Sequence, residues 1–250
     1  MNGNDFAAQI DHAMRALFVQ QGRGTAWSAS PDPRRIEAIS RARLRLGIYN
    51  KTQVTHALAQ WVPLVDDALA DLLLQQAQQE HGHAALFRDR LRALGAAEAP
   101  FTPPAAWWWL WQGLMHPRDE VDVLEYSAAL HSLVEAWAAL YSSQAFLEVL
   151  EPVDPDTAAI YRDVVLPDER FHHQVGNTIL ATLATTPERQ ARARLGLERA
   201  RLLYPLLQAD NQRLADAELA ALTSGRAGER SAAAPASGQH SRPQPPDPDA

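Results

Sequence analysis

Apolar residues recur at intervals of three and four positions over most of the chain, and this spacing limits its fold more than any other feature. Such a period places apolar side chains on one face of an α-helix, whereas the alternating pattern of a half-buried strand is almost absent. The sequence therefore predicts an all-α protein in which antiparallel helices pack up and down as a bundle.

Caps, prolines and glycines divide this pattern into separate helices. A capping residue followed by proline marks three helix starts, at Asp32, Asp154 and Thr186, and Gly95 marks a helix end. Pro63 is expected to break or kink a helix. The helices are predicted at about 5–20, 34–61, 66–94, 105–115, 119–150, 155–183 and 187–223.

The helical pattern extends over residues 1–223, which we predict to form a single domain. Residues 224–250 are rich in Pro, Ala, Ser and Gly and contain almost no large apolar residue. Such a segment cannot bury enough apolar surface to fold, so we expect a disordered tail.

The composition excludes several classes of function. The 250 residues carry a formal charge of -7, which argues against nucleic acid as the main partner. The absence of cysteine excludes thiolate-bound zinc, haem-thiolate and iron–sulfur sites, so any metal must be held by carboxylates and histidines. No apolar run approaches the roughly 20 residues of a membrane span, and the first residues lack a signal-peptide pattern. We therefore expect a cytoplasmic protein with no membrane partner.

Two Glu-x-x-His motifs are the strongest candidates for a functional site. Glu80 with His83, and Glu169 with His172, each place a carboxylate and an imidazole on one helix face, one turn apart. Glu135 lies near the middle of the helix predicted between them. Facing helical turns of this kind, joined by further glutamates, build sites for two iron or two manganese ions.

The position of a predicted turn supports this interpretation. The chain should turn near residues 152–154, which places Glu135 about 17 residues before the turn and Glu169 about 16 after it. In an antiparallel pair, residues equidistant from the turn lie at the same level. We therefore expect Glu80, His83, Glu135, Glu169 and His172 to hold the metal ions.

Taken singly, each of these residues has a structural explanation, as a solvated glutamate or a hydrogen-bonded histidine at the edge of a bundle; the whole set favours a dinuclear site. His131, one turn before Glu135, is an alternative ligand or a supporting residue. We expect Asp163, Asp168 or Asp89 to hold the remaining imidazole nitrogens. Pro167 removes a helix hydrogen bond just before the second motif, which either widens the helix or produces a simple kink.

At these residues, over about 34–184, the chain resembles the ferritin-like di-iron carboxylate superfamily. In that superfamily the second and fourth helices of the bundle carry Glu-x-x-His and the third carries a Glu. Glu80 and His83, Glu135, and Glu169 and His172 match these roles one by one. The resemblance implies two iron ions, with manganese or a mixed pair as alternatives, and O2 as co-substrate.

The superfamily also has an acidic ligand on the first helix, and here the chain departs from it. Counting back from the turn near Pro63 leads to residues 48–50, which include no carboxylate. Glu37, Asn50, His56 or no residue at all are the alternatives for this ligand.

Residues 53–95 also resemble the heme-oxygenase-like di-iron oxidases and oxygenases, which take their ligands from three helices and need none from the first. That family usually has a histidine four residues before its last acidic ligand, where this chain has Val165. The ferritin-like bundle is the first expectation and the heme-oxygenase-like bundle the alternative.

Both resemblances imply a non-haem di-iron oxidoreductase, an oxidase or oxygenase for a small, partly apolar organic substrate, with an external electron donor or reductase. The alternatives are a binding or interaction protein on the same bundle without a competent metal site, and a ferroxidase without an organic substrate. The tryptophans at 107–109 and 111 cannot share one helix face, so they either pack the end of the bundle, line a substrate channel, or form a subunit contact. A homodimer is therefore left open.

Overall fold

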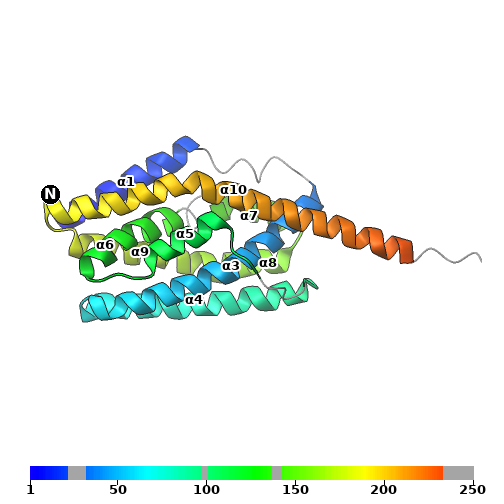
Figure 1. The fold of residues 1–250 in the computed structure, drawn as a ribbon, viewed down its shortest axis with the longest axis horizontal. Coiled ribbons are helices and arrows are strands. Elements are labelled where there is room, and N and C mark those ends of the chain that lie inside the picture. The colour runs from blue at the N-terminus through cyan, green and yellow to red at the C-terminus, as the bar shows by residue number, and fades with distance from the viewer. Residues whose placement is uncertain (22–31, 97–100, 137–141, 233–250) are drawn as a thin grey trace, which may run out of the picture.

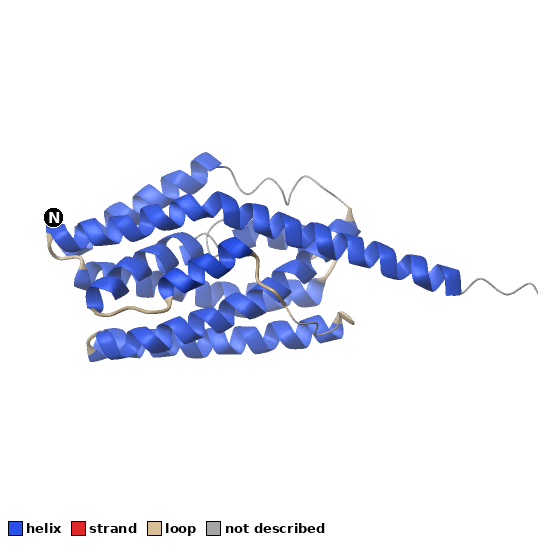
Figure 2. Ribbon diagram, viewed as in Figure 1, coloured by secondary structure: helices blue, strands red, loops and turns tan. Residues whose placement is uncertain are grey.

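The computed structural model of the chain describes residues 1–21, 32–96, 101–136 and 142–232. Within these residues every regular element is a helix, and the helices pack side by side as a bundle (Figures 1 and 2). The all-α bundle predicted from the sequence is confirmed. Among the described residues, no helix combines the length and the apolar character that crossing a membrane requires.

Two antiparallel hairpins form the centre of the bundle. In the first, α3 (Pro33–Trp61) and α4 (Asp67–Ala93) pack against each other and are joined by the short turn η1 (Val62–Leu64). The second ascends through α6 (Glu120–Ala129), η2 (Leu130–Glu135) and α7 (Ser143–Leu150). It returns through α8 (Pro155–Ile160), η4 (Tyr161–Val165) and α9 (Leu166–Leu183), and α9 packs against α4.

The remaining helices cover these hairpins. Helix α1 (Gly3–Gln21) packs on α9, and α10 (Pro187–Ala232) packs on α6, α3 and the tryptophan-rich α5 (Ala105–Leu114). In Figure 1 the C-terminal part of α10 extends beyond the other helices. Helix α10 continues past Thr223, where its end was predicted, to Ala232, and residues 233–250 of the predicted tail lie outside the described residues.

Helix ends follow the local signals in the sequence. The side chains of Asp32, Asp66 and Asp154 accept hydrogen bonds from backbone N–H groups in the first turns of α3, α4 and α8. Gly95, with a φ of +65°, follows the end of α4. These starts and this stop agree with the prediction, because capping acts within a single turn and is encoded locally.

The two long helices predicted at 119–150 and 155–183 each contain a wider, π-helical segment. Segment η2 ends at Glu135, and η4 ends one turn before Glu169. Pro167 has no backbone N–H, so the carbonyl group of Asp163 loses its α-helical partner within η4. Such segments inside α-helices are frequent at functional sites, and here both adjoin a candidate ligand.

The apolar core is divided into two clusters. Along α3, one cluster includes Ile36, Ile39 and Leu44, and the other includes Val54 and Leu58. The polar residues of the candidate site lie between these two levels, enclosed by apolar packing at both ends.

Candidate metal centre

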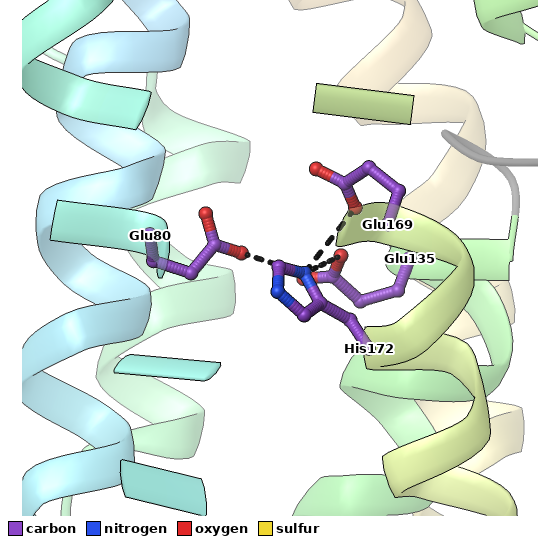
Figure 3. A group of neighbouring side chains, drawn as sticks. All are labelled: Glu80, Glu135, Glu169 and His172. Atoms are coloured by element: carbon purple, nitrogen blue, oxygen red, sulfur yellow. Dashed lines mark ion pairs between the residues drawn. The ribbon is translucent and has the colours of Figure 1, made fainter. Parts of the chain in front are cut away.

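Glu80, Glu135, Glu169 and His172 form a buried cluster in the middle of the bundle. One ligand atom from each residue lies within 4.8 Å of the ligand atoms of the others. Glu80 and His172 are fully buried, and the two other glutamates are 2% exposed. Figure 3 shows the four side chains pointing toward one another from α4, η2 and α9. Four of the five predicted ligands therefore come together.

The Nδ1 atom of His172 lies at the centre of this cluster. It is 3.3 Å from Glu80 Oε1, 3.5 Å from Glu135 Oε2 and 3.8 Å from Glu169 Oε2. The opposite nitrogen, Nε2, donates to Gln79 Oε1 at 3.0 Å. A neutral His172 would carry its single proton at Nε2 in this contact, so that Nδ1 would present a lone pair to a cation among the three carboxylates.

His83, the fifth predicted ligand, lies beside the cluster and outside the group of four. Its Nε2 atom donates to Asp168 Oδ2 at 2.9 Å, and its Nδ1 atom lies 3.3 Å from Glu80 Oε2. The rings of His83 and His172 are 6.1 Å apart between centroids. His83 therefore contacts one of the four residues and could serve a neighbouring position.

Asp168 and Gln79 connect the two histidines. Gln79 Nε2 donates to Asp168 Oδ1 at 2.9 Å, so one amide–carboxylate pair orients both imidazoles. Of the three aspartates offered as alternatives for this role, Asp168 fills it for His83, whereas Gln79 fills it for His172. Asp163 pairs instead with Arg162, and Asp89 pairs with an arginine on its own helix, both at exposed positions.

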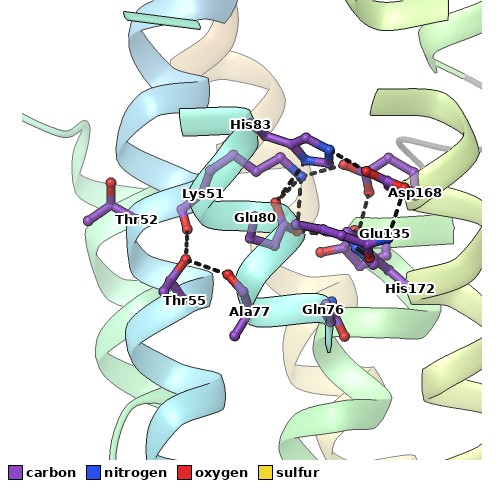
Figure 4. Close-up of polar contacts among 12 residues, drawn as sticks. Lys51, Thr52, Thr55, Gln76, Ala77, Glu80, His83, Glu135, Asp168 and His172 are labelled. Carbon is purple, nitrogen blue, oxygen red and sulfur yellow. Dashed lines mark hydrogen bonds and ion pairs between the residues drawn. The ribbon is translucent and has the colours of Figure 1, made fainter. Parts of the chain in front are cut away.

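Lys51 is the residue that the sequence analysis missed. Its Nζ atom lies 2.8 Å from Glu80 Oε2 (Figure 4). It also contacts Glu169 Oε1. Its side chain is 13% exposed. Lys51 follows residues 48–50, the level computed for the first-helix ligand, and it is the only lysine in the sequence. The presence of a single lysine at this level is the sequence feature that could have identified it.

The other residues considered near this level are not part of the cluster. Glu37 pairs with Arg41 at 2.9 Å, Asn50 Oδ1 accepts a hydrogen bond from an indole N–H, and His56 is exposed. His131 is fully buried between Ser127 and Gln76, each 2.9 Å from one of its ring nitrogens. Its contacts are those of a hydrogen-bonded core residue.

The charges of the cluster depend strongly on one another. Burial opposes the charge of Lys51, but Glu169 and Glu80 outweigh this effect and hold its pKa well above the usual value. Burial would raise the pKa of Glu80, but Lys51 and the two histidines lower it to about 2. Lys51 and contacts with Glu135 and His172 likewise overcome burial and hold the pKa of Glu169 well below the usual value.

The pKa values of Glu135 and His172 are both raised. Burial and the negative charge of Glu169 raise the pKa of Glu135 to about 8. Burial would lower the pKa of His172, but its contacts with Glu135, Glu169 and Glu80 raise it to about 12. In the absence of a metal ion, protons on His172 and Glu135 therefore reduce the repulsion among the carboxylates.

Among the residues that the structure describes, three buried atoms at the centre of the cluster face one another at 3.5–3.8 Å from His172 Nδ1 without a hydrogen-bond partner: Glu135 Oε2, Glu169 Oε2 and His172 Nδ1. Leaving such atoms unsatisfied is costly, and a cation bound between them would satisfy all three. Carboxylate and imidazole donors suit iron or manganese. The residues therefore fit a metal ion, and this buried group could hold one.

A cavity of about 170 Å3 lies beside the cluster, and Lys51, Glu135 and Glu169 line it. Much of its remaining wall is apolar and includes Trp107 and Trp111 from α5. A small molecule in this space would therefore lie next to the candidate ligands.

The tryptophan-rich helix α5 contributes both packing and cavity wall. Trp107 and Trp111 are buried, and their indole N–H groups donate to Asn211 and Asn50, which also line the cavity. The two tryptophans between them are exposed. Two of the three interpretations offered by the sequence, a packing segment and a channel wall, are thus both compatible with this helix, and the third, a subunit contact, stays a prediction.

No family model, no curated protein and no solved structure matches this chain. The helical bundle with a buried Glu/His cluster is compatible with a di-iron helical fold. The choice between a ferritin-like and a heme-oxygenase-like bundle stays a prediction.

Proposed function

We propose that this protein is an O2-activating non-haem metalloenzyme, an iron- or manganese-dependent oxidase or oxygenase for a small, partly apolar organic substrate. One observation carries the proposal: three buried ligand atoms, which have no hydrogen-bond partner among the described residues, converge with Glu80 Oε1 in the middle of the bundle. Such an arrangement costs stability unless a cation occupies it, and its oxygen and nitrogen donors suit redox-active iron or manganese.

The cavity supports an organic substrate. Its wall places Trp107, Trp111 and Phe87 together with the side-chain amides of Asn50 and Asn211. Aromatic rings would bind the apolar part of a substrate, and the amides, oriented by the indole N–H groups, would bind a polar group. This mixed wall favours an oxidase or oxygenase over a ferroxidase, which needs no organic molecule beside its metal.

When bound, the metal would supply the activation of O2, which the side chains of this cluster cannot perform. Glu80, Glu135, Glu169 and His172 would hold it, and Gln79 would keep Nε2 of His172 protonated, so that Nδ1 is free to bind. The apolar wall would exclude water from the reaction.

An oxygenation reaction requires an external source of electrons. Inserting one oxygen atom of O2 into a C–H bond and reducing the other to water consumes two electrons and two protons beyond those of the substrate. An external reductase or chemical donor is therefore part of the proposal.

A second candidate function, a binding protein without metal, is favoured by Lys51. Its ammonium group already supplies a cation to Glu80 and Glu169. In that case the cluster would be a buried ion-pair network that keeps the helices in register.

Metal analysis and O2 consumption test the proposal. Protein purified without chelator should contain iron or manganese, and the Fe(II)-loaded protein should consume O2 faster when a suitable organic compound is present. Glu135→Gln should abolish metal retention, whereas Glu37→Gln, the same change at a residue outside the cluster, should leave it intact. Absence of bound metal after Fe(II) addition would support the binding protein. O2 consumption unaffected by any organic compound would support a ferroxidase.

A further inference from the structure

The two oxygen atoms of Glu80 border two different positions. Oε1 lies 3.3 Å from His172 Nδ1, on the side of Glu135, whereas Oε2 lies 3.3 Å from His83 Nδ1 and 2.8 Å from Lys51 Nζ. Lys51 Nζ is closer to Oε2 than to Oε1, from which it is 3.1 Å away. Glu80 thus lies between the metal position described above and the Lys51 ammonium group.

The two oxygen atoms of Glu169 also face these two positions. Its Oε2 atom faces His172 Nδ1, and its Oε1 atom contacts Lys51 Nζ. Two carboxylates that each direct one oxygen to either side would bridge a pair of metal ions. The second of the two positions is where the Lys51 ammonium group lies (Figure 4).

His83 supplies a third donor to the second position. A neutral imidazole has one N–H group, and the contact with Asp168 places it on Nε2. With its proton on Nε2, His83 would present the Nδ1 lone pair to a cation beside Glu80 Oε2, from which Nδ1 is 3.3 Å away. The Lys51 ammonium group is the cation in that position, 2.8 Å from Glu80 Oε2.

We infer that Lys51 takes the place of a second metal ion, so that the centre holds one divalent ion with an ammonium group beside it. This inference rests on the proposed function, because it presupposes that the first position binds a metal. The single charge of Lys51 and the double charge of one divalent ion together balance the three carboxylates. The dinuclear centre predicted from the sequence would therefore be a mononuclear one.

The choice of lysine agrees with this role. Every other basic side chain among the 23 Lys and Arg residues is an arginine, and the single lysine lies in the cluster. An ammonium group is a compact point charge with three donors on a flexible stem, whereas a guanidinium group is broad and planar. The compact ammonium group therefore suits the space of an ion between two carboxylates better than a guanidinium group does.

The test is the number of metal ions that saturate the protein. Wild type, Lys51→Met, Lys51→Glu and a control, Thr52→Ala, would be stripped with chelator and titrated with Mn(II) under anaerobic conditions. Bound manganese would be counted after gel filtration, and its EPR spectrum would distinguish isolated ions from exchange-coupled pairs. Thr52 is a suitable control because its hydroxyl group bonds to the carbonyl of Ile48 in its own helix.

Wild type and Thr52→Ala should bind one Mn(II) per chain with the spectrum of an isolated ion. Lys51→Met, which replaces the ammonium group by an uncharged thioether of similar length, and Lys51→Glu, which adds a first-helix carboxylate, should bind two with a coupled spectrum. Adding His83→Ala to Lys51→Met should return the count to one. If Lys51→Glu fails to fold, the number of Mn(II) ions bound by Lys51→Met tests the inference.

Two ions in wild type, or one in Lys51→Met, would overturn this inference and leave the proposed function standing. No bound metal in any variant would overturn both. The two failures are therefore distinguishable.

Discussion

Gly176 permits the close approach of α9 to η2 that brings the ligands together. An ideal Cβ atom added at Gly176 would lie 2.1 Å from His131 Cβ and 2.7 Å from His131 Cγ. Carbon atoms pack best at about 3.5–4.0 Å, so Gly176→Ala requires the two helices to separate by roughly 1.5 Å. Because His172 precedes Gly176 by one turn and Glu135 follows His131 by one turn, the same displacement separates two ligands.

The cost follows from two opposing effects. Overpacking of a buried contact costs about 1–3 kcal/mol. Replacing glycine by alanine within a helix stabilises the folded protein by up to about 1 kcal/mol, because alanine has the higher helix propensity. We therefore expect Gly176→Ala to lower the free energy of unfolding by about 1–2 kcal/mol and to weaken metal binding.

Gly82→Ala is the matched control, because Gly82 lies within α4 and an added Cβ atom there has no neighbour within 4 Å. Gly82→Ala should raise the free energy of unfolding by up to about 1 kcal/mol and leave metal binding unchanged. Urea unfolding of the chelator-treated proteins measures the stabilities, and Mn(II) titration measures affinity. Equal stabilisation by both substitutions would refute the packing of α9 against η2 described here.

Two further substitutions test the surroundings of the centre. Burial lowers the pKa of His131 to about 3. Below pH 6.5 the unfolded chain therefore takes up a proton at this residue that the folded protein lacks. The free energy of unfolding should then fall by about 1.4 kcal/mol for each pH unit toward pH 3. Urea unfolding at pH 7 and pH 5 should show a smaller loss for His131→Gln than for wild type; equal losses would contradict a neutral His131. Trp111→Phe removes the indole N–H group bound to Asn50 and should cost about 1 kcal/mol in thermal unfolding while metal content stays the same. A lower metal content would mean that α5 also positions the ligands.

Local sequence signals predict the helices well because they act within one turn. Asp32 and Asp154 cap the helices that they were expected to start, and Gly95 follows the end of one. Because the rise per residue of an α-helix is constant, the positions of Glu135 and Glu169 in the sequence also suffice to place them at one level.

Tertiary contacts limit what the sequence predicts of the site. Segment η2 contains no proline or other signal that distinguishes it from a regular helix, whereas Pro167 indicated the distortion at η4. Gln79 belongs to a run of glutamines, and only the approach of α9 selects it as the partner of His172. Lys51 was missed because only residues able to bind a metal ion were sought at its level, although the level itself was predicted within one residue.

The central claim is that Glu80, Glu135, Glu169 and His172 bind a metal ion together, and anomalous diffraction from crystals soaked anaerobically with Fe(II) tests it most directly. Data collected at the iron absorption edge should show a peak within about 2–2.5 Å of one oxygen from each glutamate and of His172 Nδ1. A peak elsewhere, or an unchanged cluster without a peak in protein that is saturated with Fe(II), would contradict the account.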